Sequence, residues 1–299
     1  MGHGERALAV RSSVLLLLLL LLAPRTLFSQ ALLLPPLPIR EASTAQGLLP
    51  EVSPWAEFRH FPAESGGTFH SHVLDFGSAI TLYAAGPFAL DGMVRQVLLT
   101  RLHPDGEWLF WLAALYTDLR LGVRWNAAPW DFSLAYRHDC KHDIETYYGR
   151  DAAHDAVALT AGLRSLRWSW PVPGAEARLA AEAEAALAIP LLFQYNPPEP
   201  DRFSLSARLD WEPWRVPGWP VPFLSGGAAL ILRSQETRVT VTETTALDWH
   251  LRAGLRLEGE GSRSGTLTAY GQLQSLSDDW MSLEPKAALL LSYGLLIGF

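Results

Sequence analysis

The chain has 299 residues, with 24 basic and 31 acidic side chains, and this mildly acidic balance argues against a nucleic-acid partner. Its single cysteine, Cys140, cannot form an intramolecular disulfide, which excludes a fold held together by disulfide bonds. The chain is nonetheless 49% apolar and contains 12 tryptophans. Because this apolar content is high for a water-soluble protein, the location of the apolar surface is the first question.

The N-terminus has the features of an export signal. Arg6 and Arg11 precede an unbroken apolar run at 14–22, and Ser29-Gln30-Ala31 is a small-x-small cleavage site. This apolar run is too short to cross a bilayer as a helix, which takes about 20 residues. We therefore expect residues 1–31 to be a signal peptide that is removed on export.

The mature chain divides into two parts. Residues 32–67 are rich in proline, including Pro35 and Pro36, and are predicted to be an irregular N-terminal segment. Residues 68–299 are predicted to form a β-barrel. Within this part, residues 85–114 do not give a clear strand or helix pattern.

From Leu115 onward, apolar and polar residues alternate with the period of a β-strand. For example, Leu121 and Val123 fall on one face, and Arg120 and Arg124 fall on the other. The same alternation recurs in segments of about ten residues that are separated by turns. These segments are 130–137, 157–164, 178–187, 203–212, 221–232, 247–258, 267–274 and 286–299.

The nature of the two faces favours a transmembrane barrel over a soluble β-sandwich. One face is almost purely aliphatic and the other repeatedly carries Arg, Asp and Glu, as expected for lipid outside and a polar interior. Backbone groups in lipid must be hydrogen-bonded within the protein, which requires a closed sheet. Short turns alternate with longer loops, and tryptophans cluster near the short turns, which is typical of a girdle at the periplasmic interface.

We therefore predict an all-β fold: a transmembrane, antiparallel, up-and-down β-barrel of about ten strands, with eight or twelve as alternatives. An even number follows if both ends are periplasmic. A barrel of this size is filled by side chains, and its inward arginines are expected to pair with inward carboxylates. The expected arginines are Arg120, Arg124, Arg137, Arg164, Arg178, Arg208, Arg252 and Arg256, and the expected carboxylates are Asp118, Glu182, Glu184, Asp210 and Glu258.

The C-terminal residues 292–299 read Ser-Tyr-Gly-Leu-Leu-Ile-Gly-Phe. This sequence, ending in an aromatic residue at Phe299, resembles the C-terminal insertion signal of bacterial outer-membrane β-barrel proteins. The resemblance implies an outer-membrane location, contact with outer-membrane lipids, and recognition of Phe299 by the barrel-assembly machinery.

The candidate functional site lies in residues 130–142. His138, Cys140 and His142 continue the apolar, lipid-facing row of this strand, where polar side chains are out of place. His138 follows Trp130 by eight positions, about 26 Å along the strand before tilt, which places it near the outer leaflet boundary.

The sequence Tyr136-Arg137-His138-Asp139-Cys140 resembles the His-x-Ser motif of outer-membrane phospholipase A and the outer-membrane lipid A deacylases, with Cys in the Ser position. The resemblance implies a lipid acyl hydrolase in which Cys140 is the nucleophile and His138 the general base. These families orient the His with a third polar residue on the adjoining strand. We assign Asp155 to this catalytic set, and His142, Glu145 and His154 to binding.

Two other functions remain open. One is a non-enzymatic barrel with a structural, adhesive or narrow-channel role, in which the histidines lie among lipid headgroups. The other is a surface site for zinc or copper at His138, Cys140 and His142, with His154 or Asp155. Alternate residues of a strand stand about 6.6 Å apart, which is too far to share one ion without a bulge.

Overall fold

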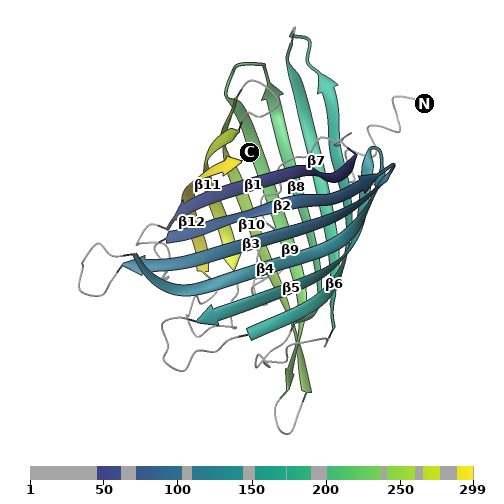
Figure 1. Ribbon diagram of the computed structural model, residues 1–299. Coiled ribbons are helices and arrows are strands. Elements are labelled where there is room, and N and C mark those ends of the chain that lie inside the picture. Colours follow the sequence, from purple (N-terminus) through teal and green to yellow (C-terminus); the bar gives the residue numbers. More distant parts are fainter. Residues whose placement is uncertain are drawn as a thin grey trace, which may run out of the picture.

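The computed structural model describes residues 46–61, 72–102, 110–143, 152–172, 174–189, 201–236, 241–259, 265–276 and 288–298. In these residues the chain forms one closed antiparallel barrel of twelve strands (Figure 1). Each strand pairs with its neighbours in sequence, and the first and last strands pair to close the sheet. The predicted all-β closed barrel is therefore confirmed. None of the described residues forms a helix long and apolar enough to cross a membrane.

The strands are long and follow one another directly. Their bounds are β1 Gly47–His60, β2 His72–Ala85, β3 Phe88–Leu102, β4 Phe110–Ala127, β5 Trp130–Asp143, β6 Ala152–Ser169, β7 Glu176–Ala188, β8 Asp201–Arg215, β9 Val221–Glu236, β10 Val241–Glu258, β11 Thr266–Leu276 and β12 Ala288–Gly298. The predicted signal peptide and its cleavage site, and Phe299 with its expected role in assembly, lie outside the described residues.

The count is twelve, the larger of the alternatives to ten, because two regions hold strands that the sequence pattern did not reveal. One is β1, which lies in the segment expected to be irregular; the other is 85–114, which holds β3 and the start of β4. Pro50 falls at the register shift between Leu48 and Glu51 on β1. Prolines are tolerated at bulges but argue against a strand in a sequence, so β1 was hidden.

The outer surface of the barrel is apolar, as the alternation predicted. Leu121 and Val123 on β4 are 50% and 53% exposed, and equivalent rows occur on the other strands. The tryptophans near the short turns are also exposed on this surface: Trp125, Trp130, Trp168, Trp170, Trp211, Trp214 and Trp219. The short connections lie at one end of the barrel, together with the start of β1 and the end of β12.

The interior is filled by ion pairs. Arg120 lies 3.1 Å from Asp118 and 2.6 Å from Glu184, and Glu184 also accepts a hydrogen bond of 3.3 Å from Arg137. The predicted inward arginines all have carboxylate partners, but several of these were not foreseen. The unforeseen partners are Glu57 for Arg252, Asp91 for Arg124, Asp131 for Arg164, Asp139 for Arg137, Glu176 for Arg178 and Glu212 for Arg256.

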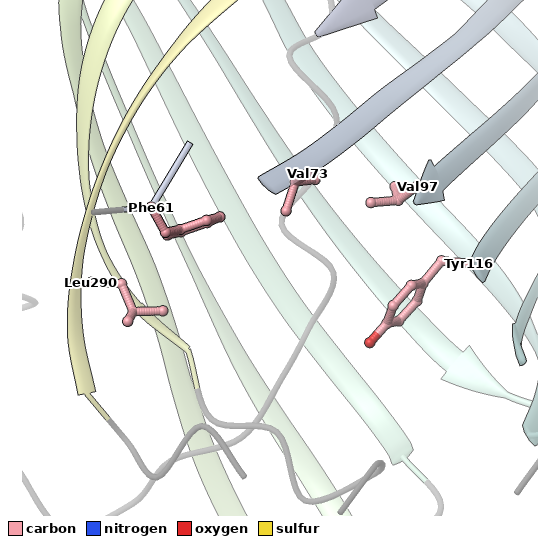
Figure 2. Packing of buried hydrophobic residues seen from close by; sticks show 5 residues of the cluster. All are labelled: Phe61, Val73, Val97, Tyr116 and Leu290. Carbon is pink, nitrogen blue, oxygen red and sulfur yellow. The ribbon is translucent and has the colours of Figure 1, made fainter. Parts of the chain in front are cut away.

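The interior also contains a cavity and an apolar cluster. A cavity of about 240 Å³ is lined by charged and small side chains, including Arg120, Arg164 and Gly162. Towards the longer-loop end, five buried apolar side chains gather inside the wall: Phe61, Val73, Val97, Tyr116 and Leu290 (Figure 2). They come from β2, β3, β4, β12 and the residue after β1, so this apolar cluster lies beside the β1–β12 closure.

Candidate functional site

The candidate site is built on two adjacent strands, β5 and β6. Their antiparallel register places His138 directly opposite Asp155. On β5, exposed Phe132 and Leu134 share a face with His138 because side chains alternate along a strand. On β6, exposed Val157 and Leu159 share a face with Asp155 in the same way. His138 and Asp155 therefore meet on the outer, apolar surface of the barrel and not in its interior.

The two side chains are in direct contact. Nδ1 of His138 lies 2.8 Å from Oδ1 of Asp155. The hydroxyl of Tyr136, two positions before His138, donates a hydrogen bond to the same carboxylate oxygen. The side chains of His138 and Asp155 are 17% and 4% exposed, so the carboxylate is largely covered although it lies on the outer face.

This arrangement fixes the chemistry of the imidazole. An ionised carboxylate can only accept hydrogen bonds, so the contact with Asp155 requires Nδ1 of His138 to carry a proton. In a neutral imidazole, Nε2 is then the basic nitrogen. In Ser-His-Asp triads the carboxylate holds the His in this tautomer and leaves Nε2 to take a proton from the nucleophile.

Cys140 follows on the same face of β5, two positions beyond His138 and half-buried. In the ladders it lies opposite Thr117 on β4 and Ala153 on β6. Directly opposed residues of an antiparallel pair have Cβ atoms about 5 Å apart, so the Thr117 hydroxyl belongs to the surroundings of the thiol. The backbone therefore brings an acidic residue, a His and a Cys to neighbouring positions on one face.

The residues assigned to binding are not all brought to this place. His142 continues the outward row of β5, opposite Leu115. His154 lies opposite Asp139 in the ladder. Asp139 pairs with the interior residue Arg137, so His154 belongs to the row of Asp139 and not to the outward row of Asp155. Glu145 lies outside the described residues.

The structure gives no support to a metal site at these positions. Among the described residues, which include His138, Cys140 and His142, no group of three or more His, Cys, Asp or Glu side chains could hold a metal ion. The spacing of the strand accounts for this, since three alternate residues span about 13 Å and cannot all reach one ion without a bulge.

Sequence reasoning missed two neighbours of the site. The sequence alone gives Tyr136 no role of its own, and it does not single out Thr117. A Tyr in an apolar row has a hydroxyl that must find a partner, and a carboxylate two positions away across the ladder supplies it. That need was the available signal for Tyr136.

No protein-family model and no curated protein matches this chain. Its fold is similar to solved structures of outer-membrane proteins. A dimeric outer-membrane phospholipase from Salmonella typhi with bound calcium aligns with a TM-score of 0.44 and 11% identity, covering 87% of this chain and 94% of that one. LpxR from Salmonella typhimurium aligns with a TM-score of 0.43 and 9% identity, covering 83% and 99%. The β domain of the Bordetella autotransporter Brka gives 0.39 and 12%, covering 83% and 97%. These similarities assign no role to any residue of this chain.

Proposed function

We propose that this chain is an outer-membrane β-barrel that hydrolyses acyl esters of outer-leaflet lipids. In this proposal Cys140 is the nucleophile, His138 is the general base, and Asp155 orients His138. The observation that carries the proposal is the hydrogen bond between His138 and Asp155 on the apolar outer surface of the barrel.

The membrane location rests on the surface of the barrel. Rows of exposed leucine and valine surround it, and the pairing of β1 with β12 closes the sheet, as a spanning β-structure requires. The exposed tryptophans at the short-turn end mark one interface. His138 lies about 26 Å along β5 from Trp130, or about 20 Å in height at the usual strand tilt, near the far margin of an apolar band about 25 Å tall.

The free-energy cost of placing the Asp155 carboxylate on an apolar surface supports a functional role for the site. A carboxylate facing the apolar margin of a membrane is unfavourable unless its charge is compensated by hydrogen bonds. Asp155 accepts two such bonds, from the Tyr136 hydroxyl and from Nδ1 of His138. Buried, hydrogen-bonded titratable groups next to a nucleophile are typical of catalytic sites.

The reaction would proceed in two steps through a thioester. Nε2 of His138 takes the proton from the Cys140 thiol, and Sγ attacks the ester carbonyl carbon. Collapse of the tetrahedral intermediate breaks the carbon–oxygen bond, and the imidazolium returns its proton to the departing alcohol oxygen. Water, deprotonated by His138, then attacks the thioester, releases the fatty acid and restores the thiol.

The barrel surface gives this reaction its access route. A lipid in the outer leaflet reaches His138 and Cys140 by lateral diffusion, because both residues lie on the outer face of β5. Its acyl chains lie against the exposed side chains below the site, such as Leu134, Val157 and Leu159. Lateral access removes the need for a substrate channel through the barrel interior.

The test is acyl-chain release by the purified, refolded barrel from mixed micelles of phospholipid and from lipopolysaccharide. We expect release by the wild type and none above background by Cys140→Ala or His138→Ala. Leu255→Ala, at an exposed position of β10 away from the site, is the control and should retain activity. If wild type releases no acyl chain from either lipid, or if both site variants release as much as wild type, the hydrolase assignment is wrong and a non-enzymatic barrel is favoured.

A further inference from the structure

A second group of polar side chains lies on the outer surface, away from β5 and β6, where β1, β2 and β12 meet. It consists of Phe58, His60, His72 and Tyr293, which we call the seam cluster. The alternation on each strand puts these side chains outside, since Trp55, Val73 and Leu290, at positions of the opposite parity, are buried inside the barrel.

The rings of the seam cluster are packed against one another. The imidazoles of His60 and His72 have centroids 4.7 Å apart, and Phe58 stacks on His72 at 5.4 Å. The ring centroid of Tyr293 lies 5.0 Å from that of His60, and Tyr293 is 55% exposed. Two histidines and a phenol are thus held together on a surface that is mostly apolar.

One polar atom of the seam cluster lacks a partner. Nδ1 of His60 is buried and makes no hydrogen bond among the described residues. A buried polar nitrogen without a partner is unfavourable, and in a membrane no bulk water compensates for it. This nitrogen would gain a partner if a ligand bound against the imidazole and the ring turned towards it.

The position of the cluster identifies its surroundings. His60 is the last residue of β1 and pairs with Tyr293, and this is the last pair of the β1–β12 ladder. Beyond it, β12 continues to Ala288 in its pairing with β11. His72 is the first residue of β2, so the cluster lies at the longer-loop margin of its strands, with exposed Leu291 and Leu295 beside it.

We propose that the seam cluster is a binding site for the phosphate of an outer-leaflet lipid. Imidazole N–H groups and a phenol hydroxyl are hydrogen-bond donors, and several donors gathered at one place suit the acceptor oxygens of a phosphate. The leucines of β12 provide the apolar surface on which the acyl chains of the same lipid lie. This proposal rests on the membrane location of the barrel and is independent of hydrolysis at Cys140.

The experiment uses the Cys140→Ala barrel, which cannot consume the lipid by the proposed reaction, in a phosphate-free detergent. Phosphatidylglycerol and diacylglycerol with the same acyl chains are added separately, and bound lipid is counted by native mass spectrometry. We expect phosphatidylglycerol to bind at least tenfold more tightly than diacylglycerol. His60→Ala combined with His72→Ala should abolish that difference, and Leu205→Ala, at an exposed position of β8 away from the seam cluster, should preserve it.

Further measurements distinguish loss of lipid binding from misfolding, and lipid binding from binding of free phosphate. His60→Phe with His72→Phe keeps packed rings but removes the imidazole N–H donors, and should also lose the preference for phosphatidylglycerol. Folding of each variant is checked by its heat-dependent gel mobility. Equal binding of the two lipids by wild type, or an unchanged preference in both double variants, would overturn the proposal. Displacement of the lipid by millimolar inorganic phosphate would assign the cluster to free phosphate instead, which also overturns it.

Discussion

His138 on β5 and Asp155 on β6 face each other across one rung of an antiparallel ladder, with Nδ1 of the histidine 2.8 Å from Oδ1 of the aspartate. Both residues belong to regular strands, so their separation is set by backbone pairing and not by a loop. Groups held on rigid elements keep their geometry better than groups on loops. The proposed catalytic pair should therefore be preorganised before any lipid arrives.

The first prediction concerns the carboxylate. Asp155→Asn keeps the shape of the side chain, but its amide no longer forces the proton onto Nδ1 of His138. By analogy with the same exchange in Ser-His-Asp enzymes, kcat should fall by about 10²–10⁴-fold with the fold retained. The measurement is the rate of acyl release by the refolded variant at saturating lipid.

The matched control is Asp139→Asn. Asp139 is adjacent to His138 in sequence but on the opposite face, where it pairs with Arg137 at 2.7 Å. The exchange is chemically the same, but it leaves the contact between His138 and Asp155 in place. The activity of Asp139→Asn should therefore stay within about threefold of wild type, a difference of less than about 0.7 kcal/mol. Equal losses in the two variants would mean that charge loss near β5, and not the His138 contact, lowers the rate.

The second prediction concerns Tyr136. Its hydroxyl donates a hydrogen bond to Asp155, so we assign Tyr136 as a positioning residue that acts through this carboxylate. Tyr136→Phe removes one hydrogen bond to an ionised group, which is worth about 1.5–3 kcal/mol. Part of this should appear as a kcat lower by about tenfold with KM unchanged. A change in KM alone would instead place Tyr136 in lipid binding.

The third prediction uses the single cysteine. A lipid-soluble maleimide should modify wild type once, at Cys140, and abolish acyl release at the same rate at which the mass increases. His138→Ala should slow the modification, because the imidazole no longer assists formation of the thiolate. Full activity of the completely modified barrel would exclude Cys140 as the nucleophile.

The alternation of residue types predicted most of the fold, because each strand of a transmembrane barrel has one apolar face and one polar face. Leu121 and Val123 were placed outside and Arg120 and Arg124 inside, and the structure confirms all four. β1 was not predicted because Pro50 and Pro54 interrupt the alternation, and because its inward row includes Trp55, an apolar residue in a polar interior.

The candidate site was predictable only in part. The faces of His138 and Cys140 followed from the period of β5, and Asp155 was assigned to the site. The pairing of Asp155 with His138 did not follow, because the loop between the strands leaves the register open and a slip of one residue would have turned Asp155 inwards. His154, one position away, was an equally good candidate in the sequence and lies opposite Asp139 instead.

The last prediction concerns the interior ion pairs. Glu184 is buried between Arg120 and Arg137, at 2.6 Å and 3.3 Å, so Glu184→Ala leaves two interior guanidinium groups with one carboxylate fewer. Breaking a buried pair typically costs about 3–5 kcal/mol, and we expect about 2–3 kcal/mol here because each arginine keeps a second acidic partner. Urea unfolding of the barrel in lipid vesicles gives the measurement.

Glu258→Ala is the control, because Glu258 pairs with Arg215 where its side chain is 28% exposed, and its loss should cost less than about 1 kcal/mol. Equal losses in the two variants would show that the interior network does not stabilise the barrel more than a pair at its rim does.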